Sequence, residues 1–451
     1  MAIESRNPFN NEILKSFEEE TDNQILGKIE LAESTYRDWK TTSFTHRKEL
    51  MLKAAVLLRH RKKQYAQLMT LEMGKAKREA ISEIEKCALV CDYYAENAEE
   101  FLSDHKLEVP DGEAYVAHDP IGIVLAVMPW NFPFWQVFRF AAPNIMAGNV
   151  GLLKHASNVP QCALAIAEVF EDAGFPKGCF QSLLISSSKV NMILDDERVK
   201  AATLTGSEEA GSKVAERAGK NLKKTVLELG GSDPFIVLKD ADIEKAAKTG
   251  AKGRMINNGQ SCIAAKRFIL VESIADEFLN IFTKEFEKIR IGDPGNDAFD
   301  YGSMAREDLA IELEEQVQKS VKGGARILFG GKRDKAFFEP TILTDVKAGM
   351  SAYEEELFGP VAVILIAKNE NHAVELANDS RFGLGGSLWS KDLEKAKNLV
   401  RKVESGAVYI NKLMASHPTV PFGGVKMSGY GRELSEIGIT EFVNQKTIWI
   451  G

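Results

Sequence analysis

Short apolar segments alternate with amphipathic segments along most of the chain, and this alternation limits the folds that it can adopt. Candidate strands such as IGIVLAVM (121–128), GNVGLLK (148–154) and AATLTG (201–206) are separated by candidate helices, for example at 161–173 and 208–218. Repeated pairs of this kind form βαβ units, in which parallel strands make a sheet that helices cover on both faces. The pattern predicts an α/β protein with doubly wound parallel sheets.

The alternation occurs in two series, which predicts two Rossmann-like domains. Residues 22–102 have apolar residues at three- and four-residue spacing and are expected to be helical. After Gly231 a second series begins, with candidate helices at 243–255, 274–289, 371–378 and 392–403. We therefore assign 1–101 and 121–230 to one domain and 231–427 to the other. The remaining segments, 102–120 and 428–451, are expected to form a small β extension.

The last segment, EFVNQKTIWIG, is a candidate strand with no partner nearby in the sequence. An unpaired strand at a chain end tends to pair with another chain. We therefore predict that this extension is an oligomerisation segment and that the protein is a homodimer or a homotetramer.

Composition argues against several classes of function. The net charge is −8, whereas a nucleic-acid-binding protein usually has a basic face, so no nucleic-acid partner is expected. The uncharged stretch 120–138 contains three prolines and an asparagine, which favours a buried segment over a membrane span. The N-terminus lacks the apolar core of a secretory signal, and five cysteines give no disulfide framework. A cytoplasmic enzyme without a metal site is predicted.

Two candidate chemical residues lie in turns or at strand ends. Cys262, in NNGQSCIAAK, follows a helix and precedes a strand, so it could be presented as a reactive thiol; taken alone, a buried inert cysteine is the more common case. Glu228 ends the apolar segment TVLE and precedes Gly230 and Gly231. A partly buried carboxylate there could act as a general base, although a capping role is the alternative.

Two further features suit anion binding. Gly206 and Ser207 stand between a candidate strand and a candidate helix, where free backbone N–H groups favour a pyrophosphate. The segment lacks the residue order of a P-loop, and no Gly-x-Gly-x-x-Gly motif occurs in the chain. Asn131, within MPWNFPFW, is held among rigid apolar neighbours, so its amide could stabilise an oxyanion, or it could simply form a turn.

Seven motifs, in the same order over residues 5–451, resemble those of the aldehyde dehydrogenase superfamily. They are MPWNFP (128–133), LLK (152–154), LTGSEEAG (204–211), LELGG (227–231), NNGQSC (257–262), EEELFGP (354–360) and PFGGVKMSGYGRE (421–433). The details KHAS and HPTVPFGGVK resemble the bacterial succinate-semialdehyde dehydrogenase branch. The resemblance implies an NAD- or NADP-binding first domain, a catalytic second domain and an aldehyde substrate.

The resemblance also implies residue roles. It makes Cys262 the nucleophile, Glu228 the general base, and Asn131 with the Cys262 N–H the oxyanion hole. The implied cofactor-binding residues are Trp130, Lys154, Ser157, Gly206, Ser207, Leu229, Glu356 and Phe358. Many relatives have a glutamate where this chain has Ser157, and that glutamate favours NAD by binding the adenosine ribose. Ser157 would leave an NADP 2′-phosphate without an opposing charge.

The substrate expectation rests on Arg139. It lies in the otherwise apolar segment WQVFRFAAPNIM, eight residues after Asn131, where the resemblance places an arginine in succinate-semialdehyde dehydrogenases. Its guanidinium would suit a substrate carboxylate; the alternative is a pair with a structural carboxylate. Phe134 and Phe358 are expected to line a short tunnel, with His417 at its mouth. Succinate semialdehyde is thus the first expected substrate and glutarate semialdehyde the second.

Two other classes of protein remain as alternatives. A cysteine hydrolase or thioesterase would also use Cys262 but normally needs a histidine partner, and none of the seven histidines stands in a recognisable triad motif. A protein that has lost its activity would be expected to lack Cys262 or Glu228, and both are present.

Overall fold

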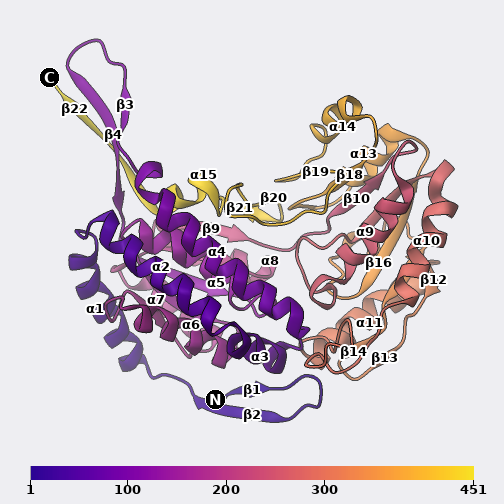
Figure 1. Cartoon of the computed structure of the whole chain (residues 1–451), viewed down its shortest axis with the longest axis horizontal. Coiled ribbons are helices and arrows are strands. Elements are labelled where there is room, and N and C mark those ends of the chain that lie inside the picture. Colours follow the sequence, from indigo (N-terminus) through magenta and orange to yellow (C-terminus); the bar gives the residue numbers. More distant parts are fainter. Residues whose placement is uncertain (1) are drawn as a thin grey trace.

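The computed structural model describes residues 2–451 and has two α/β lobes with a β arm that projects from one of them (Figure 1). The first lobe holds a six-stranded sheet in the order β21-β9-β8-β5-β6-β7. All neighbouring pairs in this sheet are parallel except β21 with β9. The strands are β5 (Ile123–Met128), β6 (Val150–His155), β7 (Phe180–Ser182), β8 (Val199–Thr205), β9 (Lys224–Glu228) and β21 (Gly429–Tyr430).

Helices flank this sheet, and their sequence patterns explain their ends. α1 begins after Thr21, whose side chain forms a capping box with Gln24, and α8 begins after the capping residue Ser207. The helices are α1 (Asp22–Trp39), α2 (Phe44–His60), α3 (Lys62–Met73), α4 (Lys77–Phe101), α5 (Trp135–Met146), α6 (Pro160–Ala173), α7 (Val190–Asp195) and α8 (Glu208–Lys220). Every residue of α5 is buried, so this helix forms the centre of the lobe.

The second lobe holds a seven-stranded sheet in the order β12-β15-β16-β11-β10-β18-β19. Its strands are β10 (Pro234–Val237), β11 (Arg267–Val271), β12 (Arg326–Phe329), β15 (Thr341–Thr344), β16 (Val361–Ala367), β18 (Ser387–Trp389) and β19 (Tyr409–Ile410). Its main helices are α9 (Ile243–Met255), α10 (Ala275–Glu287), α11 (Glu307–Lys322), α13 (Glu370–Asn378) and α14 (Leu393–Val400). Each lobe has its own apolar core. The prediction of two doubly wound sheets is confirmed.

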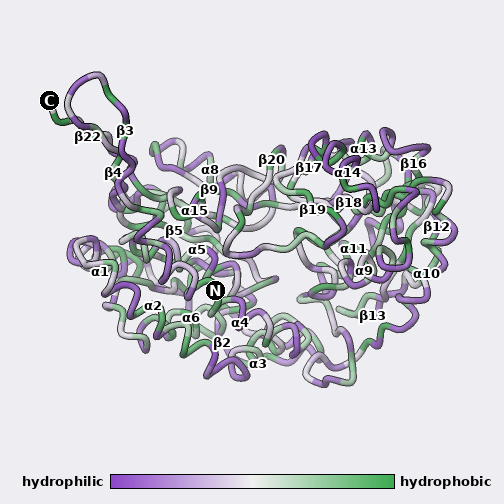
Figure 2. Tube along the Cα trace, turned by 45° about the horizontal axis from the view of Figure 1, so that its top comes forward, coloured by the Kyte–Doolittle hydropathy of each residue, from purple (hydrophilic) through white to green (hydrophobic). Residues whose placement is uncertain are grey.

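The arm is a three-stranded antiparallel sheet in the order β22-β4-β3, and it stands clear of both lobes (Figure 2). It consists of β3 (His105–Leu107), β4 (Glu113–Pro120) and β22 (Val443–Ile450). The sequence shows no partner for the last strand nearby in the chain, and the structure supplies a distant one. β22 pairs with β4 over its whole length, from Val443 opposite Pro120 to Ile450 opposite Glu113. A partner so distant in the sequence cannot be recognised from local pattern.

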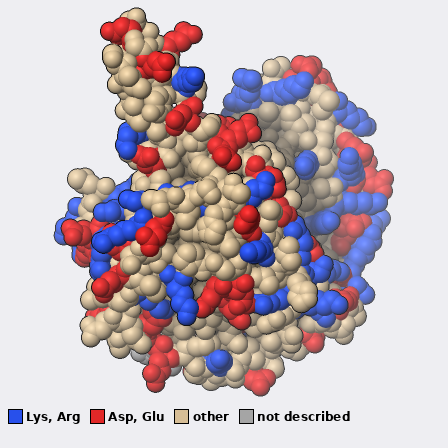
Figure 3. All heavy atoms as spheres, turned by 60° about the vertical axis from the view of Figure 1, so that its left-hand side comes forward, with Lys and Arg blue, Asp and Glu red and all other residues tan. Residues whose placement is uncertain are grey.

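Smaller elements connect these parts. A hairpin of β1 (Ala2–Arg6) and β2 (Ile13–Glu18) precedes α1, and α12 (Ser351–Glu354) precedes β16. The pair β17 (Phe382–Gly383) and β20 (Val425–Lys426) is followed by β21 and α15 (Ser435–Ile439). Within residues 2–451 no helix is both long and apolar enough to cross a membrane. Acidic and basic side chains are interspersed over the face seen in Figure 3.

Candidate active site

Most of the predicted catalytic and cofactor residues line one cavity of about 720 Å³. They are Trp130, Asn131, Gly206, Ser207, Glu228, Leu229, Cys262, Glu356 and Phe358. In the first lobe, Trp130 and Asn131 follow the carboxyl end of β5, and Gly206 and Ser207 follow that of β8. Glu228 is the last residue of β9, and Leu229 comes directly after it. Ligands of parallel sheets bind at this edge. The residues from the second lobe come from the loops before β11 and β16. The site is therefore formed by both lobes.

The turn that carries Cys262 has an unusual backbone, which explains the motif NNGQSC. Asn257, Asn258 and Gly259 all have positive φ, of 55°, 57° and 74°. Asparagine and glycine tolerate this conformation best. A Cβ at Gly259 would lie 2.4 Å from the backbone of Gly359, so only glycine fits there. The Asn258 amide donates to the carbonyls of Gly74 and Ser303, at 3.1 and 2.8 Å. The turn is thus fixed from several sides.

Two buried cations that the sequence analysis did not single out also hold this turn. The Lys266 ammonium donates to the carbonyls of Ser261 and Cys262, both at 2.8 Å. Arg254 donates to the carbonyls of Gly259 and Ala265. Burial lowers the pKa of Arg254 to about 9. Both cations satisfy carbonyl groups that would otherwise be buried without partners.

The Cys262 side chain is partly exposed to the cavity. Desolvation raises the pKa of its thiol to about 12, although the positive charges of Lys266 and Arg139 oppose this effect. The free protein therefore holds a neutral thiol at neutral pH, and nucleophilic attack requires that a base remove its proton.

Asn131 lies beside this turn and has an amide suited to bind an oxyanion. Its Nδ2 donates to the Gln260 carbonyl at 3.2 Å, and the backbone carbonyl of Asn131 accepts from Asn257 Nδ2 at 2.7 Å. An amide nitrogen carries two hydrogens, so one remains for a ligand in the cavity. The first bond orients the side-chain amide and the second holds the Asn131 backbone against the Cys262 turn, as preorganised charge stabilisation requires.

Glu228 is the last residue of β9 and is only 2% exposed. Neither of its carboxylate oxygens has a hydrogen-bond partner within residues 2–451. Desolvation and the negative charge of Glu433 raise the pKa of Glu228 well above its ordinary value, against the opposing effect of Arg139. A buried carboxyl group with a raised pKa can both accept and release a proton near neutral pH.

The cavity continues along the start of α8 into a second one of about 800 Å³, and the two share Ser207 and Glu209. A third cavity shares Lys154 with the second and is also lined by Ser157. Lys154 is 9% exposed and has no acidic or hydrogen-bonding partner in the described part of the chain. Burial lowers the pKa of Lys154.

These cavities fit a dinucleotide. The unpartnered Lys154 ammonium and the N-terminus of α8 both attract anionic or oxygen-rich groups. At the other end, Glu356 accepts from the Gly231 N–H at 3.2 Å and pairs with Lys266 at 3.1 Å, which fixes its carboxylate. The rings of Trp130 and Phe358 pack edge to face with centroids 5.7 Å apart. The nicotinamide half of such a cofactor would lie near Glu356 and Phe358.

Comparison with known proteins decides the family. The aldehyde dehydrogenase family model matches residues 1–448. The chain belongs to the aldehyde dehydrogenase family. A probable NADP(+) succinate-semialdehyde dehydrogenase of Synechocystis is 49% identical to it over 453 residues, with both chains fully covered. The NADP(+) succinate-semialdehyde dehydrogenase 1 of Mycobacterium tuberculosis is 50% identical to the chain over 456 residues, again with both chains fully covered.

A solved structure gives the same result. The succinic semialdehyde dehydrogenase from Streptococcus pyogenes, in complex with NADP+, superimposes with a TM-score of 0.98 at 40% identity, and each chain is fully covered. The resemblance inferred from the seven sequence motifs is confirmed, and the protein is an NAD(P)-dependent aldehyde dehydrogenase.

None of the three residues that the sequence assigned to the substrate is among those that line the Cys262 cavity of this aldehyde dehydrogenase. Arg139 is 2% exposed and forms an ion pair with Glu433. Its Nη2 donates to Thr205 Oγ1 at 3.2 Å, and its guanidinium lies over the ring of Phe422, 4.6 Å from the centroid. The guanidinium is thus occupied within the protein, which is the structural alternative that the sequence left open.

Phe134 and His417 also differ from expectation. Phe134 is fully buried and packs against Tyr65 and Phe138 in the core, so it lines no tunnel. His417 lies exposed on the surface, where its ring bonds to Thr419 Oγ1 at 2.8 Å.

The hydrolase alternative finds no support in this geometry. No histidine is among the described residues that line the Cys262 cavity. His155 is buried, and its ring bonds to the carbonyl of Pro133 at 2.9 Å. Burial lowers the pKa of His155 to about 4, so it stays neutral. Within residues 2–451 no group of three or more His, Cys, Asp or Glu is placed to hold a metal ion.

Proposed function

We propose that this aldehyde dehydrogenase oxidises succinate semialdehyde to succinate and uses NADP as the hydride acceptor. The observation that carries the proposal is the convergence of Cys262, Asn131 and Glu228 on a cavity that continues into a nucleotide cleft. The names of full-length relatives at 49% and 50% identity support the choice of substrate and cofactor.

The geometry supports a two-stage reaction through a thioester. The Cys262 thiol gives its proton to solvent water in the open cavity, and the thiolate attacks the aldehyde carbon. The resulting oxyanion accepts hydrogen bonds from Asn131 Nδ2 and the Cys262 N–H. The bound cofactor supplies the hydride acceptor. Loss of hydride from the carbon leaves a thioester on Cys262. Glu228 then takes a proton from water, the hydroxide attacks the thioester carbonyl, and the carboxylic acid and the thiol are released.

The wild-type enzyme itself tests the proposal. We expect kcat/KM for succinate semialdehyde to exceed that for butanal at least about tenfold, a difference of about 1.4 kcal/mol. Reduced cofactor is followed by absorbance with succinate semialdehyde, glutarate semialdehyde, butanal and benzaldehyde, each with NAD and NADP. A preference for butanal or benzaldehyde over both semialdehydes would overturn the choice of substrate.

The Ser157 position predicts how the enzyme discriminates between the two cofactors. Ser157 is exposed in the cavity that Lys154 also lines. Ser157→Glu is expected to lower kcat/KM for NADP at least about tenfold, because a carboxylate beside the 2′-phosphate repels it. NAD should be affected much less. Ser157→Gln, which has the same size without the charge, is the control, and equal losses with both cofactors would remove Ser157 from this site.

The arm supports the proposal that the enzyme forms a homodimer or homotetramer. β22 is an outer strand of the arm, and Leu107, Trp449 and Ile450 are apolar yet exposed there. Exposed apolar groups on a free strand edge favour association with another chain. We also propose a cytoplasmic location, which cell fractionation tests.

Truncation after Val443 tests the oligomer. Val443 packs against the core and the Phe442 carbonyl accepts from Asn149 Nδ2 at 2.7 Å, so both residues are kept. Loss of residues 444–451 is expected to yield a smaller species in sedimentation, because it removes the strand and its exposed apolar side chains. Deletion of Gly451 alone is the control. A truncated protein that sediments at wild-type size would contradict the role of the strand.

A further inference from the structure

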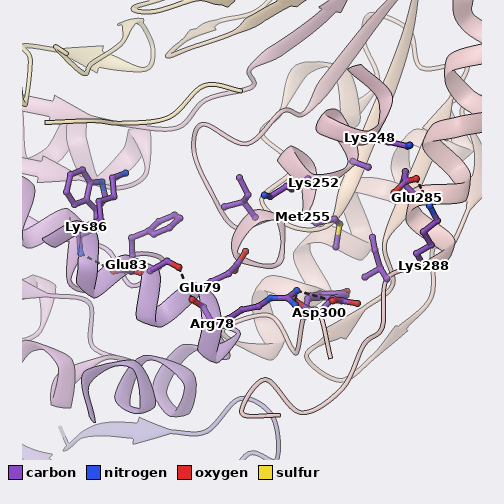
Figure 4. A pocket seen from close by; sticks show the side chains of 17 residues that line it. Arg78, Glu79, Glu83, Lys86, Lys248, Lys252, Met255, Glu285, Lys288 and Asp300 are labelled. Carbon is purple, nitrogen blue, oxygen red and sulfur yellow. Dashed lines mark hydrogen bonds and ion pairs between the residues drawn. The ribbon is translucent and has the colours of Figure 1, made fainter. Parts of the chain in front are cut away.

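A groove of about 720 Å³ runs between α4 of the first lobe and α9 of the second (Figure 4). It shares no lining residue with the cavity that holds Cys262. It nevertheless reaches Phe132 and Ile256, which are the chain neighbours of Asn131 and Asn257. The groove therefore borders the loops of Asn131 and Asn257 from the side of α4 and α9, whereas the proposed cofactor cleft runs along the start of α8.

The acidic groups at the inner end of the groove already have partners. The Glu83 carboxylate accepts from the backbone N–H groups of Phe134 and Trp135, at 3.0 and 2.9 Å, and forms a buried ion pair with Lys75. Glu79 accepts from the Asn257 N–H at 3.0 Å. Neither of these carboxylates forms an ion pair with Lys86, the lysine that follows them on α4.

Lys86 is the cation left without a carboxylate at this end of the groove. Its ammonium donates to Ser416 Oγ at 2.7 Å and lies over the Trp135 ring, 4.0 Å from the centroid. It forms no ion pair with any acidic residue in 2–451. Burial lowers the pKa of Lys86 to about 7, and the positive charge of Arg139 contributes. A partly buried ammonium without a counter-ion is costly and favours binding of an anion.

The Ser416 hydroxyl also favours an anionic ligand. Ser416 is 6% exposed, and its oxygen accepts from both Lys86 Nζ and Trp135 Nε1, the latter at 3.0 Å. A hydroxyl oxygen has two lone pairs, so both are used and its hydrogen must point toward a third group. No acceptor for that hydrogen is found within residues 2–451. Lys86 and Ser416, which lie 2.7 Å apart, therefore each have a donor hydrogen that could bind the same anion.

We propose that Lys86 and Ser416 bind the distal carboxylate of the aldehyde substrate, at the inner end of the groove between α4 and α9. This inference rests on the proposed function. It assigns to Lys86 the binding of the substrate carboxylate that the sequence predicted for Arg139. Arg139 is neutralised by Glu433, whereas Lys86 is not neutralised. The Trp135 ring, fixed by its bond to Ser416, forms the wall along which the methylene groups of a semialdehyde would pack.

Selectivity between two aldehydes tests the proposal. Lys86→Met keeps the length and apolar stem of the side chain but removes its charge. We expect the ratio of kcat/KM for succinate semialdehyde to that for butanal to fall at least tenfold, mainly through KM for the semialdehyde. Ser416→Ala should lower the same ratio by a smaller factor. An unchanged ratio in Lys86→Met, or equal losses with both aldehydes, would overturn the proposal.

Lys252→Met is the matched control. Lys252 lies on α9, on the opposite wall of the same groove, and is exposed (Figure 4). Its loss removes one positive charge from the groove without touching Trp135 or Ser416. The selectivity ratio should stay within about twofold of the wild-type value if position and not overall charge determines binding.

A binding measurement gives a second readout that does not depend on turnover. Succinate should protect the wild-type protein against thermal unfolding, and this shift should disappear in Lys86→Met but persist in Lys252→Met. If Lys86→Met does not fold, Ser416→Ala carries both measurements. A wild-type enzyme without preference for the semialdehyde would overturn the proposed function itself. A wild-type preference that survives in Lys86→Met would overturn only the role of Lys86.

The selectivity ratio should also depend on pH. Lys86 is charged below its pKa and neutral above it, so the ratio should fall as the pH rises through about 7. Titration of the catalytic groups changes kcat/KM for both aldehydes by the same factor, so this effect cancels in the ratio. The groups whose charges act on Lys86 are Glu83, Lys75, Cys87 and Arg139. A ratio that stays constant from pH 6 to pH 9 would count against binding of the carboxylate by Lys86.

Discussion

Cys262→Ala is expected to lower kcat for aldehyde oxidation by at least about 10⁴-fold, because no other group in the cavity can form the thioester. The substitution removes the sulfur but leaves the backbone that Lys266 holds through the carbonyls of Ser261 and Cys262. The turn, the oxyanion site at Asn131 and the cofactor cleft should therefore remain intact. Reduced cofactor is measured in steady state, and cofactor binding is measured by fluorescence titration.

Cys179→Ala is the matched control for loss of a thiol. Cys179 is fully buried, and burial raises the pKa of its thiol beyond any useful range. Its removal should cost some stability, on the order of 1 kcal/mol, and leave kcat nearly unchanged. Turnover above about 1% of wild type in Cys262→Ala, with normal cofactor binding, would exclude a covalent mechanism at this residue.

The regular parts of the fold could be predicted from the sequence because their patterns are local. The helix expected at 243–255 matches α9 residue for residue, and the strand and helix around Gly206 and Ser207 are β8 and α8. Cleft residues that directly follow parallel strands could be predicted for the same reason, since the carboxyl ends of those strands share one edge.

Pairings over long sequence distances could not be predicted. Nothing near Arg139 indicates that Glu433 neutralises it, and nothing near β22 indicates β4. The role of Lys266 could have been suspected, because a lysine four residues after Cys262 and directly before an apolar strand has no obvious solvent-exposed position. Lys86 gave no such signal, since lysines are common on the polar face of a helix such as α4.

The state of the Glu433 and Arg139 pair matters for Glu228, because all three charges lie close together in one buried cluster. Glu433 raises the pKa of Glu228 and Arg139 lowers it, while desolvation raises the pKa of both carboxyl groups. Arg139 pairs directly with Glu433, so its positive charge acts mainly on Glu433. Glu228 forms no ion pair within residues 2–451, and its pKa is raised well above the ordinary value, so it has the stronger tendency to hold a proton.

Glu228→Gln is therefore expected to slow hydrolysis of the thioester by at least about 10²-fold, the size of a general-base contribution. Glutamine has the same shape but cannot accept the proton from water. Rapid mixing should show a burst of reduced cofactor close to one equivalent per subunit, followed by slow turnover. Mass spectrometry after the burst should find the acyl group on the peptide that contains Cys262. Glu433→Gln is the control for loss of one carboxylate from the cluster. Its time course should show no marked burst of reduced cofactor.

The pH dependence of the two proteins gives the decisive comparison. Below its pKa Glu228 is protonated and cannot act as a base, so the wild-type deacylation rate should rise as the pH increases through that value. Because burial and the charge of Glu433 place the pKa of Glu228 well above that of an ordinary glutamate, this rise should occur at a correspondingly higher pH. Glu228→Gln should lose the rise and show a flat, low rate until hydroxide itself attacks the thioester. A variant that retains both the wild-type rate and the wild-type pH profile would show that another group activates the water.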